Sequence, residues 1–157
     1  MKAASINDIK QQLKTLPSSQ LMDICLRLAR YKKENKELLT YLLFEADDPE
    51  SYINGIKSEM DEVFSAIHST NLYLVKKSLR KILRTVTKYI RFTGSKVTEV
   101  EVLLYFCKKV KESDISYRKS PALSNMYDRL IKKCKVAVAS LHEDLQYDYK
   151  PSLDALQ

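Results

Sequence analysis

Apolar residues recur every three or four positions through a long segment in the middle of the chain. The members of this series are Leu72, Val75, Leu79, Ile82, Leu83, Val86 and Ile90. This spacing places them on one face of a helix, because an α-helix turns once every 3.6 residues. Asn71 suits the start of such a helix and Gly94 suits its end. The segment therefore predicts a long amphipathic helix from Asn71 to about Phe92, with its apolar face buried.

Six further segments carry helical signals of the same kind. The expected helices span residues 5–16, 18–31, 37–46, 49–67, 102–110 and 121–145. Ser5 with Asp8, and Asp48 before Pro49, are typical of helix starts. The segment 37–46 is apolar nearly all the way round, so we expect it, with Leu42, to be buried between other helices.

The segment that begins at Thr98 allows two interpretations. Its start, TEVEVLLYF, alternates apolar and polar residues and is rich in residues that favour strands. Thr98 and Glu101 also form the pattern of a capping box, which favours a helix. No second strand is available to pair with this one. We therefore expect a helix here, with Leu103 in the core.

The composition agrees with an all-α fold. The chain has 157 residues but only two glycines and four prolines, too few for a fold with many turns between strands. Its length is that of one ordinary domain. We therefore expect about seven helices in a right-handed bundle or a short α–α superhelix. They form a single domain over residues 1–145, and residues 146–157 follow as a loose acidic tail.

A weak internal repeat suggests how these helices are arranged. Arg30-Tyr31 is followed by ELLTYLLF from Glu37, and Arg91-Phe92 is followed by EVLLYFCK from Glu101, at offsets of 61 and 64 residues. The pattern predicts two stacked three-helix units, the second to fourth helices and the fifth to seventh. This resembles the architecture of armadillo and HEAT solenoids, although their repeats are shorter, about 40–47 residues. Chance similarity between two leucine-rich helices remains an equal alternative.

The residue patterns of common active sites are missing. His68 and His142 are far apart and lack metal-ligand spacing. Two glycines cannot make a phosphate-binding loop. Glu99 and Glu101 diverge on a helix, so they do not form a catalytic carboxylate pair. We expect no catalytic residues, no cofactor and no metal site, and hence a protein that is not an enzyme. The acidic residues around Pro49 could bind a cation, but helix capping accounts for them.

The cysteines and the hydropathy pattern bear on location. Cys25, Cys107 and Cys134 are odd in number and far apart in sequence, which is typical of buried free thiols in a reducing compartment. No apolar run reaches the roughly 18 residues of a membrane-spanning helix. The N-terminal segment is too polar for a secretion signal. We therefore expect a cytoplasmic protein.

The polar face of the long central helix is strongly basic. Between Val63 and Thr98 the chain carries eight lysines and arginines and no acid, so this segment holds the excess behind the net charge of +7. Six of these cations form the basic ridge: Lys77, Arg80, Lys81, Arg84, Lys88 and Arg91. Lys76 widens it, and Tyr73 and Tyr89 lie near its ends.

Three interpretations of the basic ridge stay open. Acids of neighbouring helices, such as Glu59, Asp61 and Glu62, or the acidic tail could neutralise it. It could bind nucleic acid or another polyanion, with further cations from residues 108–111 or 132–135. The chain could instead be a protein-interaction scaffold. We expect a non-catalytic helical binding module whose ridge binds an acidic partner, and the oligomeric state is left open.

Overall fold

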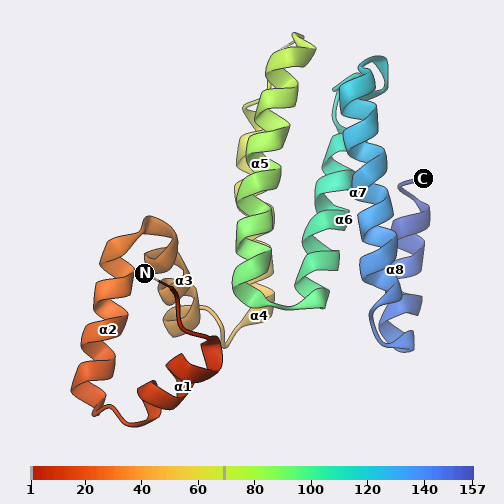
Figure 1. The fold of residues 1–157 in the computed structure, drawn as a ribbon. Helices are drawn as coiled ribbons and strands as arrows, with labels where there is room; N and C mark the ends of the chain where they lie inside the picture. The colour runs from red at the N-terminus through yellow and green to blue at the C-terminus, as the bar shows by residue number, and fades with distance from the viewer. Residues whose placement is uncertain (1, 69) are drawn as a thin grey trace. The chain divides into compact units, whose positions relative to one another are not determined.

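The computed structural model describes residues 2–68 and 70–157 and is all-helical in that part of the chain (Figure 1). Its α-helices are α1 (Ile6–Lys14), α2 (Ser18–Tyr31), α3 (Lys33–Phe44), α4 (Pro49–Ser65), α5 (Leu72–Thr93), α6 (Lys96–Glu112), α7 (Pro121–Ala139) and α8 (Glu143–Asp154). A short 3-10 helix, η1, spans Tyr117–Lys119. The all-α prediction is confirmed, and the ambiguous segment after Thr98 lies within a helix.

The chain divides into two compact units, Met1–Phe44 and Glu45–Gln157, here called unit 1 and unit 2. The sequence had suggested a single domain over residues 1–145 instead. The boundary falls in the acidic turn before Pro49. This boundary assigns α4 to unit 2 and leaves α2 and α3 in unit 1. The apolar side chains of α4 pack in the core of unit 2, which explains the assignment. The sequence had suggested two three-helix units, with the second, third and fourth helices in one and the fifth, sixth and seventh in the other. The observed division differs, because it separates the fourth helix from the second and third.

Unit 1 contains α1, α2 and α3, of which α2 and α3 form a hairpin. The amide Nδ2 of Asn35 donates a hydrogen bond of 2.9 Å to the carbonyl of Leu28 and so closes the end of α2. The expectation that residues 37–46 are buried all round was wrong. Tyr41 is buried, but Leu42 is 54% exposed. Three short helices offer too few neighbours to cover the apolar residues that lie on several sides of α3.

Unit 2 is built around α6. In Figure 1, α4 and α5 lie on one side of α6, α7 lies on the other, and α8 packs against α7. Because it has neighbours on two sides, α6 is buried around most of its circumference. Its buried residues are Thr98, Val100, Val102, Leu103, Leu104, Phe106, Cys107 and Val110. Leu103 is fully buried, as predicted.

The predicted tail is part of the fold. Residues 143–154 form α8, and Leu153 and Leu156 are buried in the core of unit 2. The backbone carbonyl of Leu156 accepts a hydrogen bond of 2.9 Å from the Tyr127 hydroxyl, and that of Ala155 accepts one of 2.7 Å from Lys111. The expectation of a loose tail was wrong, because two leucines three residues apart provide an apolar anchor.

Candidate functional site

Local sequence signals position the basic ridge, because they set both ends of α5. The side chain of Asn71 accepts a hydrogen bond from the backbone N–H of Tyr73 at the start of the helix. Gly94 follows the helix with a φ of 61°, the left-handed conformation that glycine adopts at little cost. Both ends agree with the prediction. The next helix begins earlier than predicted, because Ser95 caps α6 by accepting from the backbone N–H of Thr98.

The basic ridge lies opposite the buried face of α5. Val75, Leu79, Ile82, Val86 and Ile90 are buried. Successive residues of an α-helix are about 100° apart around its axis, so the ridge is centred roughly half a turn away from them. Lys77, Arg80, Lys81, Arg84 and Arg91 are exposed and Lys88 is half-buried. The structure therefore places all six predicted ridge residues on α5, with five of them open to solvent.

The five exposed cations of the ridge have no acidic partner among the residues that the structure describes. Within residues 2–68 and 70–157, no carboxylate lies at salt-bridge distance from them. They repel one another along the helix, because cations three or four residues apart are neighbours on its surface. The arrangement concentrates positive charge without local neutralisation.

Asp61, one of the acids that could have neutralised the ridge, pairs with residues of α6 instead. Asp61 on α4 accepts hydrogen bonds of 2.8 Å from the Tyr105 hydroxyl and lies 2.9 Å from Lys109 Nζ, both on α6. Glu59 and Glu62 are exposed, and neither pairs with the ridge in the described chain. α8 packs against α7, and its residues make no ion pair with the ridge in the same range.

An aromatic side chain extends the exposed surface at the start of α5. Tyr73 is 67% exposed and lies on the same side of the helix as Arg91, five turns away. Lys76 Nζ lies 5.5 Å from the centre of the Tyr73 ring. At the other end, Lys88 Nζ lies 5.2 Å from the ring of Tyr89. Tyr89 is half-buried against the core, so of these two rings only that of Tyr73 is open to stack on a planar group of a ligand.

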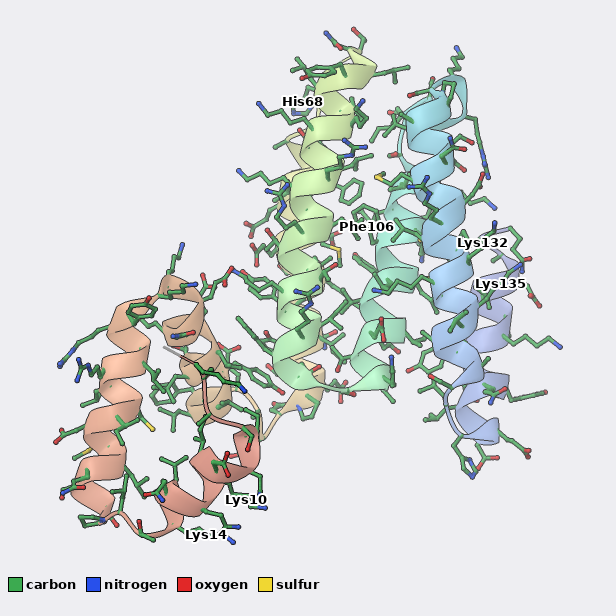
Figure 2. All side chains as sticks on the ribbon, in the orientation of Figure 1. Lys10, Lys14, His68, Phe106, Lys132 and Lys135 are labelled. Carbon is green, nitrogen blue, oxygen red and sulfur yellow. The ribbon has the colours of Figure 1, made fainter. Side chains whose placement is uncertain are left out.

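Most of the other lysines that could have extended the ridge are used within the fold. Lys109 pairs with Asp61, Lys111 donates to the Ala155 carbonyl, and Lys133 Nζ lies 3.1 Å from Glu99. Figure 2 shows Lys132 and Lys135 on α7, and α6 separates that helix from α5. The ridge is therefore a feature of α5 alone.

A partly buried polar network of α4, α6 and α8 was missed in the sequence. Glu101 accepts hydrogen bonds from Lys57 Nζ at 2.5 Å and from the Tyr149 hydroxyl at 2.7 Å. Glu99 points elsewhere, to Lys96 and Lys133, so the two glutamates diverge as predicted. The partners of Glu101 are 44 and 48 residues away in sequence. No local pattern relates positions that far apart.

The network lines a groove of about 660 Å³ between α4, α6 and α8. Leu104 and Leu156 form part of its wall, and Lys108 lies at its edge. In the described residues, every buried side-chain nitrogen and oxygen has a hydrogen-bond partner. Groups that are already paired are not poised for a ligand, so the network is best explained as a connection between three helices.

The hydrogen bonds to Glu101 make the stability of the fold depend on pH. Partial burial raises the pKa of Glu101, but the hydrogen bonds from Lys57 and Tyr149 outweigh it, so the pKa lies below the usual 4.5. A lowered folded-state pKa stabilises the protein above the unfolded pKa, and this contribution disappears as pH falls through the folded value. We expect Glu101→Gln to lower the free energy of unfolding near neutral pH. The difference in this free energy between variant and wild type should shrink as the pH falls below about 4.5. Urea melts from about pH 7 to pH 3 measure this, and a difference between variant and wild type that is constant with pH would contradict it.

The histidines and cysteines do not form a site in the described chain. His142 caps α8, where its Nδ1 accepts a hydrogen bond from the backbone N–H of Asp144. No group of three or more His, Cys, Asp or Glu residues there could hold a metal ion. Cys107 and Cys134 are buried as predicted and hydrogen-bond to each other, which with burial raises the pKa of the Cys107 thiol. Cys25 is exposed, contrary to the expectation that all three thiols are buried.

Comparison with known proteins adds no family to these observations. No protein-family model, no curated protein and no solved structure matches the chain. No α-helix in the described residues is long and apolar enough to cross a membrane. The basic ridge on α5 is therefore the candidate site that the geometry itself supports best.

Proposed function

We propose that the chain is a non-catalytic helical binding module, and that the basic ridge of α5 binds a polyanion. One observation carries this proposal: five exposed cations lie on one helix face with no acid beside them in the described chain. Two effects make the binding of an anionic ligand to such a surface favourable. The ligand relieves repulsion between the cations, and it releases its own counterions.

The shape of the ridge favours an extended ligand. From Lys77 to Arg91 the helix advances about 21 Å, at about 1.5 Å per residue. A linear polyanion, such as a nucleic-acid strand or an acidic protein segment, could contact several cations along this length. A straight row of cations contacts phosphates without reading base edges, so we expect little sequence preference. We place the protein in the cytoplasm, because three cysteines without paired spacing are typical of a reducing compartment.

The test is a triple variant, Lys77→Gln, Lys81→Gln and Arg84→Gln. Glutamine has a helix propensity close to those of Lys and Arg, so α5 should persist. We expect weaker binding to heparin and to a single-stranded oligonucleotide, and a slope of log K against log salt that is smaller by about 2–3. Fluorescence anisotropy titrations at several salt concentrations measure both quantities.

The matched control is Arg129→Gln, Lys132→Gln and Lys150→Gln, which removes three exposed cations from α7 and α8. Both variants lower the net charge equally, so only a local site makes them differ. The free energy of unfolding of the ridge variant should stay level or rise slightly, because repulsion is removed. Loss of stability with unchanged polyanion binding would refute the proposal and make the ridge structural. A parallel titration with polyglutamate tells an acidic protein partner from nucleic acid.

A second candidate function is a protein-interaction scaffold in which the ridge is only a solvated face. One observation favours it: many large apolar side chains of unit 1 are exposed. Under this alternative, both triple variants would behave alike in every polyanion titration.

A further inference from the structure

Unit 1 exposes most of its large apolar side chains. In its described residues, 2–44, Tyr41 is the one buried residue, whereas twelve large apolar residues are exposed. The least exposed of the twelve still show 36% of their surface, and Ile6 shows 82%. By contrast, unit 2 has a core drawn from all of its α-helices. Helices in water are stabilised mainly by packing of their apolar faces, so unit 1 lacks the contacts that a stable helical unit needs.

The exposed residues lie on organised faces. On α1, Ile6, Ile9 and Leu13 follow one another at three and four residues and so share one side of the helix. Figure 2 shows Lys10 and Lys14 on the same helix, and their positions in the sequence place them beside this apolar stripe. Ser5 and Asp8 form a capping box that starts the helix. α1 is thus a well-formed amphipathic helix whose apolar stripe is exposed.

α2 and α3 together present a second apolar face. The apolar residues of α2 occupy more than half of its circumference, and contact with one helix, α3, covers only part of that arc. Leu28 and Met22 are 54% and 60% exposed. On α3, Leu42 and Leu43 are 54% and 62% exposed, although both belong to the apolar C-terminal part of the helix, ELLTYLLF. Such a segment normally packs against other helices.

The exposed area fits a protein interface. Summed over α1, α2 and α3, the twelve exposed side chains present on the order of 1,000 Å² of apolar surface. Obligate dimers bury about 2,000 Å² or more in total, which is about 1,000 Å² from each partner. A helical hairpin with apolar residues on both helices can pair with an identical hairpin to enclose a core of four helices.

We infer that unit 1 is a dimerisation surface and that its occupant is unit 1 of a second copy of this chain. A two-fold axis brings the same patch together from both copies, so no separate complementary surface is required. Charge does not oppose this pairing strongly, because residues 18–44 carry five basic and three acidic side chains. A membrane surface would be a different occupant, and the vesicle experiment below tells it apart from a second copy of the chain.

The first test is the mass of the full chain in solution. Sedimentation equilibrium should give twice the chain mass of 18.2 kDa at micromolar concentration. Cys25 provides an independent readout, because it is exposed and lies on α2 one turn before Leu28, whereas Cys107 and Cys134 are buried. Labelling of Cys25 by a maleimide should become slower as protein concentration rises. A mass of one chain at every concentration would overturn the inference.

The second test places charges on the surface with Leu28→Glu and Leu42→Glu. We expect the mass to fall by half, Cys25 labelling to become fast at every concentration, and unit 2 to stay helical. The matched control, Leu74→Glu and Val136→Glu, changes residues of unit 2 that are 48% and 71% exposed and should remain dimeric. A variant that stays dimeric contradicts the inference. So does a monomeric wild type that co-sediments with vesicles of anionic phospholipid, because the surface would then bind a membrane. If the charged variant unfolds altogether, the wild-type mass still decides.

Discussion

Replacing Phe106 with alanine is expected to lower the free energy of unfolding of unit 2 by about 3–5 kcal/mol. Phe106 is fully buried on α6, the central helix. Its ring meets that of Phe64 on α4 edge to face, with 5.6 Å between the ring centres, and Figure 2 shows it among the helices of unit 2. The change removes apolar area from the core and leaves a cavity that the surrounding helices cannot fill without moving.

Denaturant melts followed by circular dichroism measure this effect, and Tyr147→Ala is the control. Tyr147 is also aromatic but is 80% exposed on α8, so its replacement should change stability by less than about 0.5 kcal/mol. A loss below about 1 kcal/mol for Phe106→Ala would show that α6 does not lie in a close-packed core.

Replacing both Leu153 and Leu156 with alanine is expected to cost at least about 3 kcal/mol. These leucines are 8% and 5% exposed and attach the end of the chain to the core. Without these side chains the Leu156 backbone is held less firmly, which weakens the hydrogen bond that its carbonyl accepts from the buried Tyr127 hydroxyl. A loose tail would tolerate the same changes without effect.

The control for the tail is Asp148→Ala with Lys150→Ala. Both positions are exposed on α8, and the pair leaves the net charge unchanged. Hydrogen exchange adds a local readout. Amides of α8 should exchange faster in the leucine variant than in the control, because the helix would open independently of α6 and α7. Equal exchange in the two variants would mean that the leucines do not anchor α8.

Helix α5 shows what the sequence could predict. Its apolar series, its N-cap Asn71 and its C-terminal Gly94 lie within one stretch of chain, and all of them occur as expected. The basic ridge followed from the same period, so its exposure was predictable once the buried face was known. The binding role of the ridge remains a prediction, because no observation of the fold identifies a ligand.

The errors share a physical cause. Leu42 was expected to be buried because residues 37–46 are apolar nearly all the way round a helix, but burial depends on how many helices are near enough to cover it. The acidic tail was expected to be loose because it is polar on average, but two leucines hold it. In each case the prediction rested on the average polarity of one segment, whereas burial depends on which helices pack against that segment.

The sequence by itself determined the elements of this protein that depend on local interactions. Helix type, most helix ends and the side of α5 that carries the basic ridge depend on backbone hydrogen bonds and caps within a few residues. Only the tertiary structure decided the rest: the division before α4, the central place of α6, and the contacts of Glu101 with Lys57 and Tyr149. Those features join residues more than forty positions apart. Which distant partners meet depends on the packing of whole helix faces, and many pairings of similar leucine-rich faces are compatible with one sequence pattern.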